Sequence, residues 1–335
     1  MRFLVTGAAG FIGHAVCSKL LAAGDSVIGV DMLTDYYDVA LKQARLARLT
    51  RHSGFTDFRT DICDLPAMQT VFDEHQPERI VHLAAQAGVR HSLTHPASYV
   101  QANLVGFSNI LELARNNACE HLVFASTSSV YGANTGVPFS EDQNTDHPLT
   151  LYAATKKANE VMAHSYAHLF RLPCTGLRFF TVYGPWGRPD MALFKFTRNI
   201  IRGEPIELFN HGNHTRDFTY VDDIAEGVIR AARRAAQPDP EFDTATPSPK
   251  HSNAPFRIYN IGSQRPVELR RYVRLIEECV GKPAIVKLLP MQLGDVSDTY
   301  ANVDLLANDI GYRPNTSVET GVANFVRWYR DYYSE

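Results

Sequence analysis

Short apolar segments alternate with helix-like segments through the first half of the chain. Apolar runs over residues 3–5 and 27–30 predict two strands, and the spacing of apolar side chains between them predicts a helix over residues 13–23. The pattern continues with an expected helix over residues 39–49 and expected strands over residues 55–60, 79–83 and 121–125. Regular alternation of strands and helices is typical of a parallel sheet covered by helices on both faces. The sequence therefore predicts a doubly wound α/β fold.

The pattern changes after about Pro185, where short and irregular elements with many turns are expected. A segment rich in proline, serine and threonine within residues 237–255 indicates an exposed loop, and residues 318–333 indicate an amphipathic helix. We therefore expect a larger α/β domain mainly over residues 1–184, to which later segments return. A smaller C-terminal α/β domain is expected mainly over residues 185–335.

Composition excludes several classes of protein. The chain has 335 residues and a formal net charge of −3 at pH 7, which gives no sign of binding to nucleic acid or to an anionic membrane. Its five cysteines form no C-x-x-C pair and its thirteen histidines show no spacing typical of metal ligands, so neither a disulfide framework nor a metal site is expected. The first apolar run is too short for a signal peptide, and no segment approaches the length of about 18 apolar residues that a membrane helix needs. These features predict a cytoplasmic protein without a membrane partner.

Three glycines follow the first expected strand and open the first expected helix, with the spacing G-x-x-G-x-x-G. In a dinucleotide-binding loop, Gly7 would form the tight turn, Gly10 would allow the backbone to approach a diphosphate, and Gly13 would let helix and strand pack closely. The spacing differs from the G-x-G-x-x-G of ordinary dehydrogenases. By itself the triplet fits a purely structural turn equally well.

Asp31, at the end of the second expected strand, favours the cofactor interpretation. A carboxylate at this position can accept hydrogen bonds from both hydroxyls of the adenosine ribose. It would also repel a 2′-phosphate. The sequence therefore predicts NAD as the cofactor, rather than NADP.

Other expected cofactor contacts lie beside the glycines or at the carboxyl ends of the third and fourth strands, where open α/β sheets bind ligands. They are Phe11, Ile12, Asp61, Ile62, Ala84, Ala85 and Gln86. Asp61 can reach the adenine amino group, although a turn-forming aspartate fits the same position. Asn103, on an expected helix packed against these strands, completes the set.

Tyr152 and Lys156 lie four residues apart, so on a helix their side chains share one face, about 6 Å apart along the axis. A lysine ammonium in that place can hold a tyrosine as phenolate, whose ordinary pKa of about 10 is otherwise too high for a base at neutral pH. Alone, such a pair is more often an ordinary pair on a helix surface. Together with the glycines and the serine/threonine run over residues 126–129, it indicates a nicotinamide-dependent oxidoreductase site.

Five stretches occur together in this chain: residues 6–13 (TGAAGFIG), 82–87 (HLAAQA), 130–132 (VYG), 152–156 (YAATK) and 216–223 (RDFTYVDD). Through this combination the chain resembles, over essentially its whole length, the extended short-chain dehydrogenase/reductase family and its nucleotide-sugar branch. The resemblance implies a Rossmann-type doubly wound parallel sheet that binds NAD tightly, and a smaller C-terminal domain that binds a UDP-sugar. It also implies that the catalytic residues are Thr127, Tyr152 and Lys156.

The same resemblance implies that Arg216 contacts the UDP diphosphate and that Asp295 contacts the nucleotide portion of the substrate. Related enzymes carry a second arginine shortly before the position of Asp295. Residues 290–294 of this chain read PMQLG, so the chain departs from the family pattern at that contact.

The residues after Thr127 separate the branches of the family. The 4,6-dehydratases resemble Thr-Asp-Glu at this point and UDP-glucuronate decarboxylases resemble Thr-Ser-Glu, whereas this chain has Ser128 and Ser129. The absence of a carboxylic acid favours epimerisation. Residues 35–42 and 178–192 are similar to UDP-glucuronate 4-epimerases in particular, and UDP-galactose 4-epimerases resemble an asparagine where Thr181 stands.

A uronic acid substrate sets a chemical problem that these residues can solve. Its 4-keto intermediate is a β-keto acid, which loses CO2 when the bond to the carboxylate aligns with the carbonyl π system. Substrate contacts are therefore expected from neutral hydroxyls, from the nearest positive charge, and from a methionine in the same stretch. They are Thr127, Ser128, Ser129, Thr181, Arg188 and Met191. Arg188 fits a structural ion pair equally well.

The resemblance implies a redox-neutral reaction, UDP-glucuronate ⇌ UDP-galacturonate. Tyr152, as phenolate, would take the proton of the C4 hydroxyl while hydride passes to NAD, and the keto sugar would present its other face before hydride returns. The alternatives are a UDP-glucose 4-epimerase, a UDP-glucuronate decarboxylase, or a non-catalytic NAD-sensing module.

A homodimer is also expected. The helices around residues 93–116 and 151–169 carry apolar and aromatic side chains that look exposed in sequence: Tyr99, Phe107, Met162 and Tyr166. The family resemblance implies that these helices pair in a four-helix dimer interface. The alternative is that the same side chains pack on the sheet.

Overall fold

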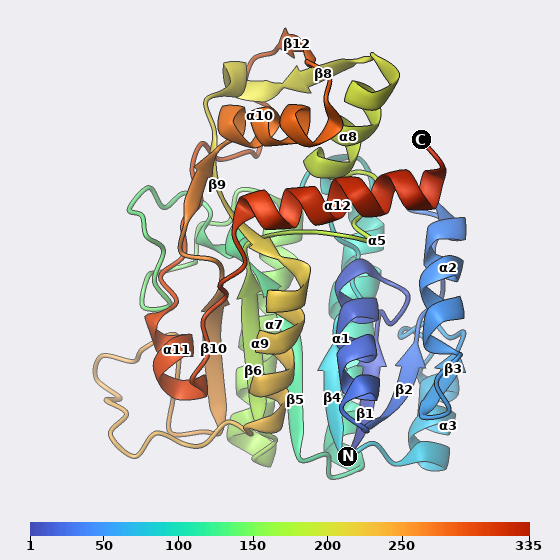
Figure 1. The fold of residues 1–335 in the computed structure, drawn as a ribbon. Coiled ribbons are helices and arrows are strands. Elements are labelled where there is room, and N and C mark those ends of the chain that lie inside the picture. The colour runs from blue at the N-terminus through green and yellow to red at the C-terminus, as the bar shows by residue number, and fades with distance from the viewer.

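A seven-stranded parallel sheet is the central element of the computed structural model, which describes all 335 residues (Figure 1). Its strand order is β10-β6-β5-β4-β1-β2-β3. The bounds are β1 Arg2–Thr6, β2 Ser26–Val30, β3 Phe55–Phe58, β4 Arg79–His82, β5 His121–Thr127, β6 Cys174–Phe179 and β10 Phe256–Ile261. The chain proceeds outward from β1 in one direction and from β4 in the other, so the strand order reverses between these two neighbours. Ligands bind outside the carboxyl ends of such a sheet at this reversal.

Helices cover both faces of the sheet because successive side chains of each strand point to opposite sides. Along β1, Phe3 and Val5 belong to one buried cluster and Leu4 to the other. The helices that contribute to the first cluster are α1 Phe11–Ala22, α2 Val39–Leu49, α9 Val221–Arg233 and α11 Asp304–Ile310. Those that contribute to the second are α3 Leu65–His75, α6 Phe107–Asn116 and α7 Leu151–Phe170. The predicted doubly wound α/β fold is confirmed.

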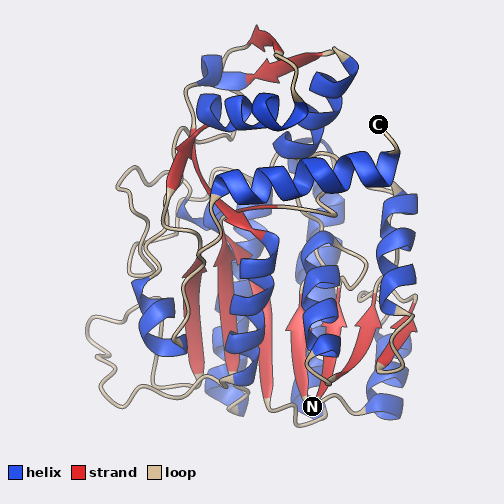
Figure 2. Cartoon of the chain, in the orientation of Figure 1, coloured by secondary structure: helices blue, strands red, loops and turns tan.

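A smaller C-terminal part lies beyond the carboxyl ends of the large sheet, as Figures 1 and 2 show. It contains the sheets β11-β9-β7 and β12-β8 and the helices around them. Their bounds are β7 Thr181–Tyr183, α8 Ala192–Arg202, β8 Pro205–Leu208, β9 Thr215–Tyr220, β11 Pro266–Glu268, α10 Leu269–Val280, β12 Ile285–Leu288 and α12 Val318–Tyr333. The space between this part and the sheet ends is therefore where a ligand is expected.

Short elements complete the chain. They are α4 His91–Thr94, α5 Pro96–Val100, a π-helical turn Gln101–Gly106, and 3-10 turns over Ser128–Tyr131 and Phe209–Gly212. None of the helices combines the length and the apolarity that a membrane crossing requires. All five cysteines are free, and no cluster of histidine, cysteine, aspartate and glutamate side chains is arranged to hold a metal ion.

The expected elements of the N-terminal half are confirmed to within a few residues, and α2 and α12 coincide with their expected bounds. The expectation of irregular structure after Pro185 was wrong, because α8, α9 and α10 are regular amphipathic helices of 11, 13 and 12 residues. Glycines and prolines between these helices favoured the prediction of turns, so the helical spacing of the apolar residues was not recognised in the sequence. Residues 237–255 contain neither helix nor strand, as expected. The domain boundary expected between residues 184 and 185 stays a prediction. Two elements that follow it in the sequence, α9 and β10, pack with the large sheet.

Two of the side chains expected at a dimer interface lie in the core instead. Tyr99 and Phe107 are 0% exposed, so the expectation for them was wrong. Met162 and Tyr166 are half-buried against the same cluster of apolar side chains. Helices on a sheet bury the face that carries their largest apolar residues, and sequence alone did not distinguish that face from an outer one.

Buried histidines make the fold sensitive to acid. Burial lowers the pKa of His14 and His82 to about 3 and the pKa of His121 to about 4. In an unfolded chain a histidine has a pKa of about 6.5, so between these values the unfolded state binds more protons than the native state. The contribution of these residues to stability is therefore fully present above a pH of about 6.5 and is lost as the pH falls toward about 3.

We expect the free energy of unfolding to decrease below pH 6.5 by up to roughly 1.4 kcal/mol per pH unit for each buried histidine. Urea unfolding across this range measures the slope. Replacement of His121 by glutamine should reduce the slope, whereas the same change at the exposed His52 should leave it unchanged. Identical slopes for the two variants would contradict this account.

Candidate active site

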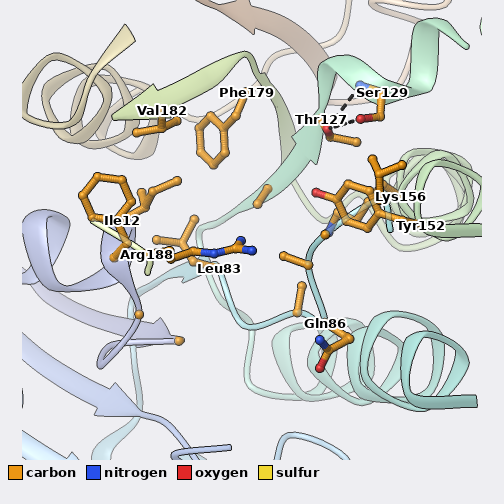
Figure 3. Close-up of a pocket in the computed structure, with 18 of the residues that line it drawn as sticks. Ile12, Leu83, Gln86, Thr127, Ser129, Tyr152, Lys156, Phe179, Val182 and Arg188 are labelled. Carbon is orange, nitrogen blue, oxygen red and sulfur yellow. Dashed lines mark hydrogen bonds between the residues drawn. The ribbon is translucent and has the colours of Figure 1, made fainter. Parts of the chain in front are cut away.

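A cavity of about 490 Å³ lies at the carboxyl ends of the central strands, below the C-terminal part (Figure 3). Every residue predicted for the site lines it, with one exception, Asn103. The cavity therefore brings together side chains from both halves of the sequence. Other lining residues that sequence reasoning did not place in the site include Thr34, Tyr36, Tyr37 and Lys42, from the segment after β2 and the start of α2.

The glycine loop connects β1 to α1 and is packed too tightly for side chains. Gly7 has a φ of +72°, and a Cβ on Gly13 would lie 2.0 Å from the carbonyl oxygen of Gly7. Helix α1 begins after Gly10, and no side chain caps its first turn. The free N–H groups and the helix dipole therefore favour an anion at this loop. The diphosphate of a dinucleotide fits this cradle.

Asp31 is held with its carboxylate at the cavity. One oxygen accepts the N–H of Ala9 at 3.0 Å and the other accepts the N–H of Leu33 at 2.8 Å. These bonds fix the carboxylate beside the glycine loop and leave lone pairs for a ribose diol. Asp61 lines the cavity and also accepts the N–H of Cys63 at 2.9 Å, so the turn-forming alternative is present. Its contact with the adenine amino group stays a prediction.

Asn103 lies behind the lining, so the structure does not support a direct cofactor contact. Its side chain accepts the N–H of Gln86 at 2.8 Å and donates to the carbonyl of Gln86 at 3.1 Å and to the hydroxyl of Thr155 at 3.0 Å. All the hydrogen-bonding capacity of the amide nitrogen is thus used inside the protein. Asn103 positions Gln86, whose own Nε2 is buried without a partner and which does line the cavity. That unpartnered donor is a candidate contact for a ligand.

Tyr152, Lys156 and Thr127 converge on the cavity from α7 and the end of β5 (Figure 3). Thr150 caps α7 by accepting the N–H of Ala153, which fixes the first turn on which Tyr152 lies. Thr127 accepts the N–H of Ser129 at 3.2 Å, and its hydroxyl lies 3.3 Å from that of Ser129. The threonine and serine hydroxyls are therefore held together at the same end of the cavity as the tyrosine.

The protonation of this group differs from the expectation that Lys156 lowers the pKa of Tyr152. Burial raises the pKa of Tyr152, and the groups that oppose this rise are the Thr127 hydroxyl and the Arg188 charge. Burial also lowers the pKa of Lys156 to about 7, although the carboxylate of Glu160 raises it. The sequence identified a suitable pair of charges but not the loss of water around both of them. Additional positive charge in the site is needed for Tyr152 to ionise at neutral pH.

A fully buried ion pair lies next to Lys156 and was not predicted. Glu160 accepts two hydrogen bonds from Arg178, both at 2.9 Å, and one from Ser126 at 2.6 Å. Arg178 also donates to the hydroxyl of Tyr131. The network joins β6, α7 and the end of β5 directly below the catalytic group. Its signals in the sequence were a glutamate four residues after Lys156 and an arginine inside a buried strand.

Replacement of Arg178 by methionine should lower the free energy of unfolding by about 3–5 kcal/mol, because it leaves the Glu160 carboxylate buried without its partner. Chemical denaturation measures the loss. The double variant with Glu160→Gln should recover part of it, since the unpaired charge is then absent. A single variant within about 1 kcal/mol of the wild type would show that the pair is not essential for stability.

The two stretches that resembled UDP-glucuronate 4-epimerases meet at the cavity wall. Arg188 forms an ion pair with Asp190, with N–O distances of 3.0 and 2.6 Å, and the hydroxyl of Tyr36 donates to the same carboxylate at 3.3 Å. The guanidinium of Arg188 also lies over the ring of Tyr36. The structural ion pair considered for Arg188 is thus present, while the residue still lines the cavity with Met191.

Arg216 and Asp295 lie together at the far end of the cavity. Nη2 of Arg216 is 3.0 Å from Oδ1 of Asp295, and its Nη1 donates to the carbonyl of Ser297 at 2.6 Å. A second guanidinium reaches the same carboxylate from another loop, because Nη2 of Arg90 lies 4.0 Å from Oδ2 of Asp295. Residues 290–294 contain no arginine, but Arg90 brings a second guanidinium to Asp295 from another part of the chain.

Comparison with known proteins gives a consistent result along the whole chain. A profile of the NAD dependent epimerase/dehydratase family matches residues 3–262. The chain is 52% identical to a probable UDP-glucuronate 4-epimerase of Rhizobium meliloti (strain 1021), over 99% of this chain and 98% of the relative. It is 48% identical to UDP-glucuronate 4-epimerase 4 of Arabidopsis thaliana, over 99% of this chain and 76% of the relative.

Solved structures match over the same length of the chain at lower sequence identity. A UDP-glucuronic acid 4-epimerase from Bacillus cereus, in complex with UDP-glucuronic acid and NAD, has a TM-score of 0.88 and 31% identity, over 99% of this chain and 100% of that one. A UDP-glucose 4-epimerase from Thermotoga maritima with UDP-glucose has a TM-score of 0.84 and 30% identity, over the same shares of the two chains. The likeness includes the large sheet and the C-terminal part.

Proposed function

The chain belongs to the NAD dependent epimerase/dehydratase family, and from this premise we propose that it interconverts UDP-glucuronate and UDP-galacturonate by NAD-dependent epimerisation at C4. One observation carries the choice of reaction. The Tyr152 hydroxyl shares its cavity with three neutral hydroxyl side chains, those of Ser128, Ser129 and Thr181. By the family patterns, elimination or decarboxylation would need a carboxylic acid at position 128 or 129, and both positions are serines in this chain.

NAD would be held by residues that already have the required form. The glycine loop and the uncapped start of α1 would hold the diphosphate, Asp31 the adenosine ribose, and Tyr152 and Lys156 the nicotinamide end. Bound NAD would supply the hydride chemistry at C4 of the sugar, and its oxidised form would add a positive charge to the site. NAD is the cofactor of this family and of its solved relatives.

The protein supplies the proton transfer. Tyr152 accepts the proton of the C4 hydroxyl and later returns it to the C4 oxygen on the opposite face of the sugar. Thr127 donates a hydrogen bond that keeps this oxygen beside the tyrosine. Burial lowers the pKa of Lys156 to about 7, and the protonated fraction of Lys156 would stabilise the phenolate together with the positive charge of oxidised NAD. Because both the proton and the hydride removed from the sugar are returned to it, the reaction is redox-neutral overall.

The keto intermediate must keep its carboxylate while it turns over. Ser128, Ser129 and Thr181 line the cavity and offer hydroxyl donors that can hold the carboxylate. Held in this way, the bond to the carboxylate stays out of line with the keto π system, so CO2 is retained. Because these donors are neutral, none of them can protonate C5 as a strong acid would.

Chromatography of nucleotide sugars tests the proposal. Purified protein incubated with UDP-glucuronate should yield UDP-galacturonate at constant total uronate, with a kcat/KM for UDP-glucuronate well above that for UDP-glucose. Turnover of UDP-glucose alone would make the enzyme a neutral-sugar epimerase. Formation of a UDP-pentose would make it a decarboxylase.

We further propose that the protein is a cytoplasmic homodimer. The homodimer is supported by exposed apolar side chains on α5, the π-helical turn and α7. They are Val100, Val105, Val161, Leu169 and Phe170. The cytoplasm is supported by the five free cysteines, which suit a reducing compartment. Light scattering should give twice the mass of the chain, and Val161→Glu should shift the mass toward the monomer. A monomeric wild type would contradict the proposal.

A further inference from the structure

Arg45 is a charged side chain buried completely within the protein. It lies in the middle of α2, and its exposed fraction is 0%. Its guanidinium makes no ion pair with any carboxylate, and Nε has no hydrogen-bond partner. Buried arginines normally face an acidic partner, because removal of a charge from water is costly unless an opposite charge compensates it. The structure of the protein chain alone gives no such compensation.

The partners of Arg45 are neutral oxygens from three segments around the cofactor end of the cavity. Nη1 donates to the carbonyl of Ala9, in the glycine loop, at 3.0 Å and to the hydroxyl of Tyr37 at 2.7 Å. Nη2 donates to the carbonyls of Trp186 and Gly187 at 2.6 and 3.3 Å. One guanidinium thus ties the glycine loop to both stretches that border the cavity there.

Lys42, one turn before Arg45 on the same helix, is also a buried cation that forms no ion pair with a carboxylate. Its side chain is buried and lines the cavity, and its ammonium donates only to the backbone and side-chain oxygens of Thr34, at 2.5 and 2.9 Å. The charge of Arg45 is felt by its neighbours, because after burial it is the main cause of the lowered pKa of His14. Neither buried cation forms an ion pair with a carboxylate, although the Asp31 and Asp35 carboxylates act to raise the pKa of Lys42 and so compensate part of its charge. The charge of Arg45, next to the loop that fits a diphosphate, has no such partner.

We propose that Arg45 is a cofactor-retention residue whose buried charge is balanced by the diphosphate of bound NAD. The bound anion would relieve the cost of burying the guanidinium, so part of the affinity for NAD comes from a strain present in the NAD-free protein. The hydrogen bonds to Tyr37, Trp186 and Gly187 would at the same time hold the neighbouring segments closed over the nucleotide. An enzyme that must keep its reduced cofactor through each turnover needs such retention. The inference concerns NAD only and holds whichever UDP-sugar is the substrate.

Variants of Arg45 test this role without any sugar. Arg45→Met removes the charge at similar length, Arg45→Lys keeps it, and Arg51→Met makes the same chemical change at an exposed arginine two residues past the end of the helix. For each variant, NAD affinity is measured by calorimetric titration of protein stripped of nucleotide. The melting temperature is measured with and without saturating NAD.

We expect Arg45→Met to weaken NAD binding on the order of tenfold to a hundredfold, the range for one charge at roughly 6–12 Å from an anion at an effective dielectric constant of roughly 20. The NAD-free variant should melt at or above the temperature of the NAD-free wild type. Arg45→Lys and Arg51→Met should bind NAD within about threefold of the wild type, since the charge is kept or was never buried.

A merely structural role for Arg45 has a different signature. Arg45→Met would then lower the melting temperatures of the NAD-free and NAD-bound forms equally, with unchanged NAD affinity, and this would overturn the proposal. If Arg45→Met does not fold without NAD, the buried charge does not strain the NAD-free protein, and the proposal fails as well. A loss of NAD affinity in Arg45→Lys as large as in Arg45→Met would show that charge is not the cause.

Discussion

Replacement of Tyr152 by phenylalanine should lower kcat by about 10²- to 10⁴-fold, the range for loss of a positioned general acid–base group. The tyrosine hydroxyl is the side chain at the cavity that can take the C4 proton and return it, and Thr127 and Lys156 act through it. NAD binding should remain nearly normal, because the glycine loop and Asp31 lie at the other end of the cofactor. Steady-state kinetics with UDP-glucuronate, together with the amount of bound NAD, measures both effects.

A matched control is available in Tyr312, whose hydroxyl donates to the backbone of Asp223 away from the cavity. Tyr312→Phe should leave kcat within about twofold of the wild type. If Tyr152→Phe keeps near-normal activity, Tyr152 is not the base. If it loses activity together with its NAD, the effect is on cofactor binding and the catalytic role remains undemonstrated, so the assignment would fail this test too.

Introduction of a methyl group at Gly13 should weaken NAD binding strongly. A Cβ there would lie 2.0 Å from the carbonyl oxygen of Gly7 and 2.8 Å from its carbonyl carbon, both of which are backbone atoms. Helix α1 must then move away from the loop, at a cost of at least the 1–3 kcal/mol typical of overpacking, so NAD affinity should fall by about 10- to 100-fold or more. Calorimetric titration with NAD measures the change.

Gly136 provides the control, because a Cβ at that position would have only a side-chain nitrogen at 3.8 Å as a neighbour. Gly136→Ala should bind NAD like the wild type. Wild-type affinity in Gly13→Ala would mean that the loop does not pack against α1 as described, and the assignment of the diphosphate cradle would have to be abandoned.

The cofactor half of the site could be predicted from sequence because each residue there follows a strand. Gly7, Asp31 and Asp61 have positions fixed by local rules for parallel sheets, so recognising the strands was sufficient. The positions of Arg45 and Arg90 followed no such rule. Arg45 is buried by contacts with segments far away in sequence, and Arg90 reaches Asp295 from a loop some two hundred residues earlier in the chain. Contacts of this kind have no periodic signal.

Burial was the property that sequence reasoning judged least well. Tyr99 and Phe107 were placed on an outer surface although they belong to the core, and Asn103 was placed at the cofactor although its amide is used by Gln86. Burial was also left out of the expected pKa values in the site. A lysine four residues after a tyrosine indicated a pair of interacting charges, but the loss of solvent around them raises the pKa of Tyr152 and lowers that of Lys156.

In the proposed reaction, hydride leaves C4 and returns to C4 within one active site. Proton NMR of UDP-glucuronate turnover in D2O distinguishes this route from the others. The expected product is UDP-galacturonate whose H4 and H5 signals keep full intensity, since the hydride never exchanges with solvent and C5 is not deprotonated. Deuterium at C4 or C5 of the product, or a pentose formed by loss of CO2, would contradict it.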